Sequence, residues 1–241
     1  APGPNADDLL TAQIKARSNK IRQAYIARTL VAERFKATSD SITIAHAEFA
    51  KLRKQRSLKM IRGWEAYWSK RYWVSFFAEV SDSPQRRREA GPIQSALNAG
   101  SMFLSGILLR WVLLHRLSPS HGYLHEPTTY MSLIYDLMEP YRYLIERSVR
   151  HACHHTKPTD AKNIIEQSLS HLKKLLDSPV YVPMTRQRVR RKNLLHGGVL
   201  ALRAYLSGEM RRFVLPTEGQ RIGGRPPKVS YKLPGGLAPV S

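Results

Sequence analysis

The sequence predicts an all-α fold, and three observations support this prediction. Long segments without Gly or Pro carry apolar residues at helical spacing, as in the run from Leu9 to Ala37. No segment of useful length alternates apolar and polar residues as a strand would, and no internal repeat is visible. Apolar residues make up 42% of the 241 residues, which is enough for a real core in one large domain or two small ones.

The first third of the chain predicts three helices that follow a loose Pro- and Gly-containing tail at residues 1–8. The second of these helices has Asp40 or Ser41 as its expected N-cap. The third is dense in aromatic residues, including Trp64 and Trp68. The expected helices are Leu9–Ala37, Ser39–Arg56 and Lys59–Val80.

The middle of the chain predicts a basic loop at residues 81–92 and then a central helix, Ile93–Leu117. This helix is apolar nearly all round, so we expect it to be buried. The uncharged stretch Ala90–Leu109 also raises the question of a membrane span. Its first half contains Gly, Pro, Gln, Ser and Asn residues, which favours a core helix over a span.

The last part of the chain predicts a loop at residues 118–130 and then three more helices, the last of them bent or broken at Gly197–Gly198. These helices are Met131–Arg150, Asp160–Leu176 and Thr185–Leu206. The predicted organisation is a tail (1–8), a helical domain (9–177), a basic helical extension (178–206) and a Gly/Pro/Arg-rich tail (207–241).

Composition restricts the partners and the compartment. The net charge of +21 attracts polyanions and makes binding salt-dependent, so nucleic acid is the first expected partner. A membrane surface ranks second, because it usually needs a compact basic amphipathic helix. The single cysteine, Cys153, excludes an internal disulfide and fits a reducing cytosol, and no secretory signal is visible.

Three acidic residues and one histidine are candidate functional residues. Asp136 and Glu139 are three residues apart on an expected helix, so both carboxylates can point at one spot. Two such acids often form a solvated face, but the apolar residues around them indicate burial, and buried acids need a metal or an arginine as partner. His125 lies at a turn, where it is either a site residue or an ordinary structural histidine.

Glu65 stands among bulky aromatics in the third helix, which argues against a casual surface charge, although an exposed acid on a basic helix is the alternative. Lys70 and Arg71 follow about one and a half turns later, where they could contact phosphate.

Across residues 60–150 the chain resembles the helical catalytic domain of the CRISPR-associated spacer-acquisition integrases. The resemblance is carried by four motifs in the family's order and approximate spacing. These are Gly63–Trp64–Glu65 before an aromatic run, RRREAGPIQSALNAGSMFLSG, Gly122–Tyr123–Leu124–His125, and DLMEPYR from Asp136 to Arg142.

The resemblance implies that Glu65, His125 and Glu139 bind a catalytic divalent metal, with Asp136 as an accessory catalytic acid. It also implies that Arg142 orients an acid or a phosphate. Carboxylates with one imidazole suit Mg²⁺ or Mn²⁺, whereas zinc and non-heme iron sites favour other ligand sets. The implied reaction is attack by the 3′-hydroxyl of a short DNA fragment on a strand of the CRISPR repeat, as in spacer acquisition for antiviral defence.

The family's usual β-rich N-terminal domain is not in this sequence, so either it was lost or the sequence begins after it. A second small adaptation protein is therefore an open partner, while two strand transfers require at least a homodimer or a dimer of dimers. The alternatives are a casposase-like transposon integrase and a non-catalytic basic DNA scaffold. The expected location is the prokaryotic cytoplasm.

Further basic residues are candidate nucleic-acid contacts, or else a solvated face. They lie in the 81–92 loop and in the segment after residue 185: Arg87, Arg88, Arg186, Arg188, Arg190, Arg191 and Lys192. The segment Gly223–Lys228 is either a minor-groove hook or a flexible tail. HACHH, residues 151–155, is expected to be an exposed loop and not a zinc site, because no second ligand pair follows at zinc spacing.

Overall fold

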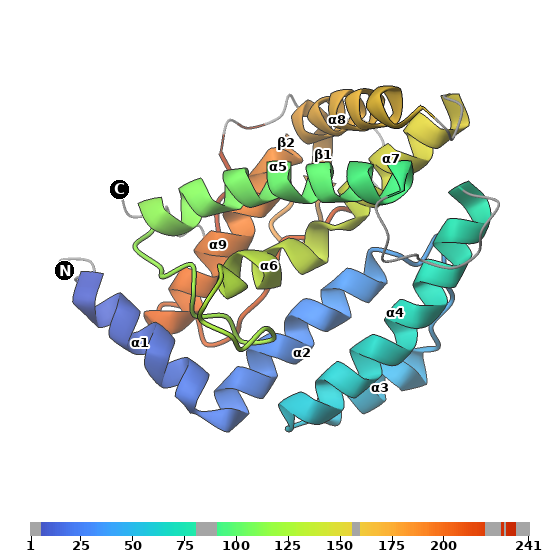
Figure 1. The fold of residues 1–241 in the computed structure, drawn as a ribbon. Helices are drawn as coiled ribbons and strands as arrows, with labels where there is room; N and C mark the ends of the chain where they lie inside the picture. Colours follow the sequence, from blue (N-terminus) through green and yellow to red (C-terminus); the bar gives the residue numbers. More distant parts are fainter. Residues whose placement is uncertain (1–5, 81–90, 156–159, 220–227, 229, 235–241) are drawn as a thin grey trace.

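The structure is a computed structural model that describes residues 6–80, 91–155, 160–219, 228 and 230–234. These residues form a mostly helical fold, as predicted (Figure 1). The basic loop residues Arg87 and Arg88, and most of Gly223–Lys228, lie outside the described residues.

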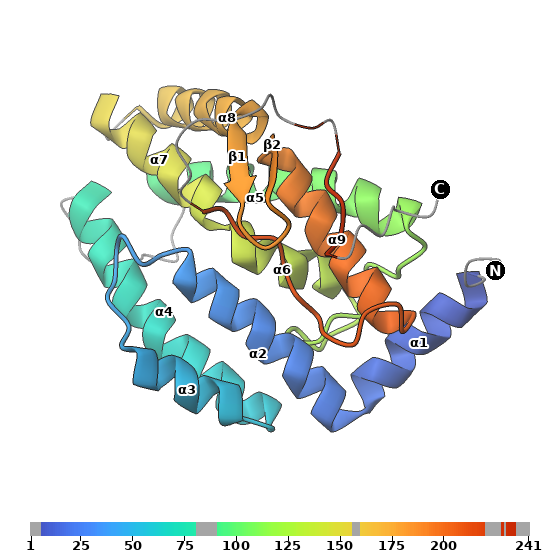
Figure 2. The same cartoon turned by 180° about the vertical axis from the view of Figure 1, so that it is seen from behind.

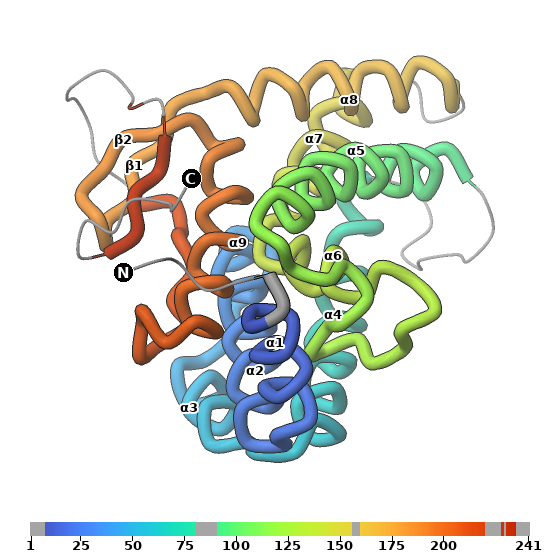
Figure 3. Tube along the Cα trace, turned by 90° about the vertical axis from the view of Figure 1, so that its left-hand side faces the viewer, coloured from blue at the N-terminus to red at the C-terminus, as the bar shows by residue number. Residues whose placement is uncertain are grey.

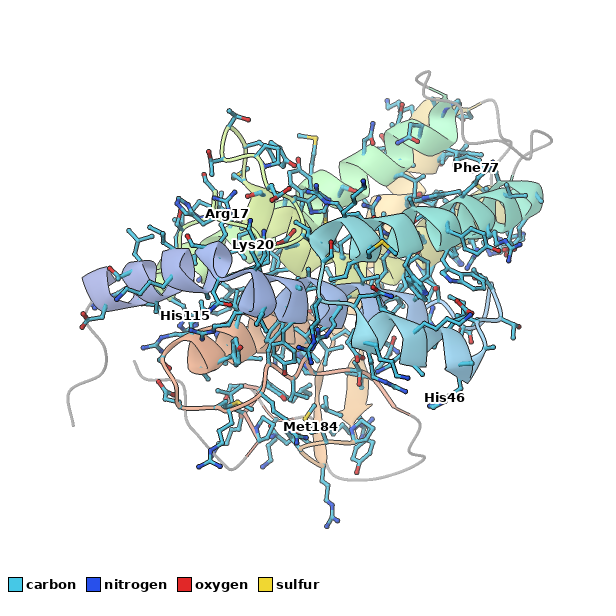
Figure 4. All side chains as sticks on the ribbon, turned by 90° about the horizontal axis from the view of Figure 1, so that it is seen from below. Arg17, Lys20, His46, Phe77, His115 and Met184 are labelled. Carbon is cyan, nitrogen blue, oxygen red and sulfur yellow. The ribbon has the colours of Figure 1, made fainter. Side chains whose placement is uncertain are left out.

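The first four helices form one side of the molecule. They are α1 (Ala6–Ser18), α2 (Lys20–Lys36), α3 (His46–Lys54) and α4 (Leu58–Val80). The predicted single helix over Leu9–Ala37 is wrong, because Asn19 interrupts it: its side chain accepts hydrogen bonds from the backbone N–H groups of Ile21 and Arg22 and caps α2. Arg17 and Lys20 flank this bend (Figure 4).

The second side is built around α5 (Pro92–Leu114), which packs against the later helices. These are α6 (Ser132–Met138), the 3₁₀ turn η1 (Glu139–Tyr141), α7 (Tyr143–His155), α8 (Ala161–Asp177) and α9 (Lys192–Leu206). Helix α8 lies along α5 and α7 (Figure 3), whereas α2 contacts both α4 and η1.

Helix α5 differs from its prediction because one of its faces stays exposed. Met102 is 76% exposed, and Leu113 and Leu114 are also exposed, while Leu104 and Leu108 are buried. Within the described residues, α5 is the one helix whose length and composition would suit a membrane span, and one face of it packs on the helical core.

A short β-hairpin corrects the prediction of a continuous basic helical extension. Strand β1 (Pro179–Val182) pairs antiparallel with β2 (Gln187–Arg190), with Val180 opposite Val189. Both of these valines are buried, and Arg186 turns the chain between the strands with φ 52°. With only four residues in each strand, the alternation of apolar and polar residues is too short to identify a strand from the sequence.

Helix α9 continues unbroken through Gly197–Gly198, and the two glycines serve packing. A Cβ at Gly197 would lie 2.7 Å from the ring of Tyr231 and 2.8 Å from Pro216. The predicted tail from residue 207 is therefore folded where the structure describes it, with Phe213, Leu215 and Tyr231 buried. Figure 2 shows this segment running over α9 and the hairpin.

The sequence HACHH is helical, which corrects the predicted loop. Residues 151–155 form the last turn of α7, and the rings of His151 and His171 stack at 4.0 Å across α7 and α8.

Candidate active site

The carboxylate of Asp136 organises the loop that carries His125. Asp136 is fully buried on α6 and accepts hydrogen bonds from the backbone N–H groups of Tyr123, Leu124 and His125. Its Oδ1 also lies 2.7 Å from Nδ1 of His125. Gly122 permits this close approach, because a Cβ there would lie 2.9 Å from Oδ2 of Asp136.

Three helices hold the same loop from outside. The Gln13 side chain on α1 donates to the carbonyls of Ser118 and His121 at 2.9 and 3.0 Å. Gln23 on α2 donates to the carbonyl of Tyr123. Arg62 on α4 donates to the carbonyl of Leu124 at 2.9 Å and forms an ion pair with Glu126. The position of His125 is thus fixed by contacts that are distant in sequence.

Glu65 and Glu139 meet at a buried arginine. The Nη1 atom of Arg34, on α2, lies 2.9 Å from Oε1 of Glu65 on α4 and 2.7 Å from Oε2 of Glu139 on η1. Because one nitrogen contacts both, the two carboxylate oxygens are no further apart than these two distances together. The sequence prediction that Glu65 and Glu139 share a site is consistent with this geometry.

Asp136 and Glu139 do not point at one spot, as helical spacing had predicted. Pro140 ends α6, and Glu139 begins a 3₁₀ turn. Asp136 faces the backbone of the His125 loop, whereas Glu139 faces Arg34 and accepts a hydrogen bond from Arg142 at 3.0 Å. The predicted role of Arg142 in orienting an acid matches this contact.

Neighbouring charges shift the pKa values of Glu139 and His125 in opposite directions. Burial alone would raise the pKa of Glu139, but the guanidinium groups of Arg34 and Arg142 outweigh it and lower that pKa. Burial alone would lower the pKa of His125, but the hydrogen bond and charge of Asp136, with the charges of Glu139 and Glu65, raise it. Both acids therefore lie within electrostatic reach of the imidazole.

The donor set fits a divalent cation on two observations. Oε2 of Glu139 is a buried oxygen without an aligned hydrogen-bond donor, although Arg34 lies beside it. Asp136 engages Nδ1 of His125, which leaves Nε2 as the ring nitrogen that can take a ligand. In the parts of the chain that the structure describes, no three His, Cys, Asp or Glu side chains yet converge at ligand distances. The guanidinium of Arg34 lies between two of the donors instead.

The predicted phosphate-contacting residues are spread over two regions. Lys70 and Arg71 are exposed on α4, where the Arg71 guanidinium lies 4.4 Å from the ring centre of Tyr67. Arg186 is exposed at the turn of the hairpin, and Arg188 is half-buried on β2. Three others in the second region form ion pairs with acids of this chain: Arg190 and Lys192 with Asp177, and Arg191 with Glu218.

Sequence reasoning missed Arg34 and Glu146. Arg34 follows Leu30 and Val31 on the buried stripe of α2, and a charge on such a stripe signals a buried partner. Glu146 is 2% exposed on α7 and accepts a hydrogen bond from the Tyr72 hydroxyl at 2.6 Å. Burial, together with this carboxylate, raises the pKa of Tyr72 far above its usual value.

Comparison with known proteins identifies a matching family model and several similar structures. A family model described as CRISPR associated protein Cas1 matches residues 4–174. A solved structure titled "Casposase bound to integration product" is similar with TM-score 0.75 and 20% identity, covering 92% of this chain and 74% of that one. A CAS1 protein from Thermotoga maritima is similar with TM-score 0.73 and 18% identity, over 85% of this chain and 72% of that one.

A third similar structure is a "Cas6-RT-Cas1--Cas2 complex", with TM-score 0.62 and 12% identity over 92% of this chain and 28% of that one. A search of curated protein sequences found no match.

Proposed function

The chain belongs to the Cas1 family of CRISPR-associated proteins, since the family model spans well over half of it, and we propose that it is a metal-dependent DNA integrase. The reaction is the joining of a short DNA fragment to a strand of a CRISPR array. The observation that carries this proposal is the buried cluster in which Glu65 and Glu139 share one cation, with His125 held in electrostatic reach.

Glu65, His125 and Glu139 are the residues that would hold Mg²⁺ or Mn²⁺. When bound, such an ion supplies positive charge that polarises the scissile phosphodiester and stabilises the attacking and leaving oxygens. Asp136 holds the imidazole ring and the loop behind it, and Arg142 holds Glu139. These contacts keep the ligands oriented before DNA arrives.

The proposed strand transfer is a transesterification that consumes no water. The 3′-hydroxyl oxygen of the fragment forms a new bond to a phosphorus atom of the target strand. The bond from that phosphorus to the neighbouring 3′-oxygen breaks, and this oxygen leaves with a proton. Two such transfers insert one fragment, so the proposed working form contains at least two copies of this chain.

DNA is the proposed partner, and the charge of +21 supports it. Proposed phosphate contacts are Lys70, Arg71, Arg87, Arg88, Arg142, Arg186, Arg188, Arg190, Arg191 and Lys192. Because a similar structure contains a Cas1–Cas2 complex, a second small adaptation protein is a further proposed partner. The proposed location is the cytoplasm of a prokaryote.

A strand-transfer assay tests the proposal. A labelled short duplex is incubated with the protein, Mn²⁺ or Mg²⁺, and a plasmid that contains a CRISPR repeat. Joined product is expected with the wild type and not with Glu65→Ala, His125→Ala or Glu139→Ala, while DNA binding in each variant stays largely intact. Wild-type product from any of these variants removes that residue from the site, and DNA binding without joined product under all conditions favours a scaffold.

A casposase-like transposon integrase is the second candidate, favoured by the similarity to a casposase over 92% of this chain. The chemistry is the same and the inserted DNA differs. Offering transposon ends and short fragments in competition, with plasmids that contain or lack a repeat, separates the two functions.

A further inference from the structure

Arg34 occupies the place between the two carboxylates to which the proposed function assigns the metal. Its side chain is 6% exposed, and one of its nitrogens contacts Glu65 and Glu139 at 2.9 and 2.7 Å. A buried cation that bridges two acids from different helices is held strongly, because removing it would leave two like charges side by side.

Carboxylates predominate over guanidinium groups around Arg34. The buried or half-buried acids of the cluster outnumber its guanidinium groups, with Glu65, Asp136, Glu139 and Glu146 set against Arg34 and Arg142. One divalent cation would offset this difference while Arg34 stays nearby. The cluster therefore favours an additional cation without requiring that an arginine leave the protein.

Each bridged acid also has a second donor that does not depend on Arg34. The Ser69 hydroxyl donates to Oε1 of Glu65 at 3.0 Å, and Arg142 donates to Oε1 of Glu139 at 3.0 Å. These contacts would keep both carboxylates in place when the Arg34 bridge opens. Oε2 of Glu139, which has no aligned donor, is the oxygen that gains most from a new cation.

We propose that Arg34 is the resident counter-cation of the metal-free site and competes with the divalent cation for Glu65 and Glu139. Arg34 thereby stabilises the metal-free fold and lowers the affinity for metal. It is a positioning residue, and this role rests on the proposed metal function of the same acids.

The first test is Mn²⁺ binding without DNA, measured by isothermal titration calorimetry. Arg34→Gln removes the competing charge but keeps a polar side chain, so it should bind Mn²⁺ about tenfold more tightly than the wild type. Arg53→Gln removes an exposed charge from α3 and should leave the affinity within about twofold, because solvent screens it. Unchanged or weaker Mn²⁺ binding by Arg34→Gln would overturn the proposal.

Thermal unfolding gives a second readout that does not depend on activity. Arg34→Gln should lower the melting temperature of the metal-free protein and show a larger rise on Mn²⁺ addition than the wild type. An unchanged melting temperature without metal contradicts the counter-cation role.

If Arg34→Gln does not fold, a measurement on the wild-type protein still tests the competition between Arg34 and the metal. Nitrogen-15 spectra of the arginine side chains, with the Arg34 signal assigned from Arg34→Lys, are followed during a Mg²⁺ titration. The Arg34 signal should change as Mg²⁺ saturates the site. A constant Arg34 signal at saturation would refute competition.

Glu139→Gln separates this inference from the proposed function. Absence of Mn²⁺ binding in the wild type, or equal binding by wild type and Glu139→Gln, means that the proposed metal site itself fails. Binding that Glu139→Gln abolishes but Arg34→Gln leaves unchanged means that only the role of Arg34 fails.

Discussion

At the scale of single residues, Asp136 has the largest number of described contacts in the candidate site. Its carboxylate accepts hydrogen bonds from three backbone N–H groups and forms a hydrogen bond with Nδ1 of His125. A buried carboxylate with this many donors fixes both the loop and the ring. Asp136 therefore positions His125, and would act on the proposed metal only through that ring.

Asp136→Asn should weaken Mn²⁺ binding by about 10- to 100-fold, because the amide cannot hold the imidazole and the three N–H groups as a carboxylate does. Calorimetry measures this loss, and circular dichroism checks that the helices persist. Asp177→Asn, at an exposed acid paired with Lys192, is the matched control and should bind Mn²⁺ normally. Equal affinities of the two variants would remove Asp136 from the support of the site.

The residues of the candidate site were partly predictable from the sequence. Asp136 and Glu139 stand among apolar residues, which indicated burial, and Glu65 stands among aromatics. Their different roles were not predictable, because the turn at Pro140 redirects Glu139 after α6 ends. Arg34 was missed because its partners lie 31 and 105 residues away along the chain, a pairing that local spacing does not reveal.

At the scale of elements, the helices were predictable and their interruptions were less so. Apolar spacing indicated α4 and α8 closely, including Asp160 at the start of α8. The Asn19 cap is local, to backbone N–H groups two and three residues further on, but an asparagine inside an apolar helical pattern does not by itself mark a break, so the sequence favoured an unbroken first helix. The packing role of Gly197 depends on Tyr231 and Pro216, which are distant in sequence, so the sequence favoured a bent or broken last helix.

Gly197→Ala should destabilise the protein by about 1–3 kcal/mol, because the new methyl group would collide with the buried Tyr231 ring and Pro216. Gly106→Ala is the matched control in the interior of α5, where nothing lies within 4 Å. Without collision it should stabilise the helix by about 0.5–1 kcal/mol. Urea unfolding of both variants measures these changes, and a neutral Gly197→Ala would show that residue 231 does not pack on α9.

At the scale of the whole molecule, a buried histidine pair joins α5 to α9. Nε2 of His115 lies 2.7 Å from Nε2 of His196, and Trp111 stacks on His196 at 3.8 Å. Burial lowers the pKa of both rings to about 4, helped by Arg203 at His115 and by His115 at His196. Both rings are therefore neutral in the folded protein near pH 7.

The free energy of unfolding should fall as the pH is lowered from about 6.5 to about 4. In this pH window the histidines of the unfolded chain, which have ordinary pKa values, become protonated, while the folded pair stays neutral. Protonation therefore favours the unfolded state. The expected loss between about pH 7 and about pH 5 is on the order of 2 kcal/mol for each ring. Urea unfolding at several pH values measures it, and the double variant His115→Gln, His196→Gln should show a smaller loss.

His46→Gln is the control for this measurement, because His46 is exposed and should leave the pH dependence unchanged. A wild-type stability that is flat across this window would contradict protonation of the pair as a source of acid sensitivity.

The way the His125 loop is anchored has a consequence for how the chain could be divided. The four motifs begin near residue 60, but residues before them support the site. Gln13 and Gln23 donate hydrogen bonds to the His125 loop, and Arg34 forms an ion pair with Glu139. A fragment trimmed to residues 60–150 would retain every proposed ligand and lose the scaffolding that aligns them. The opening helices thus form part of the candidate site, although they contribute none of its proposed metal-binding atoms.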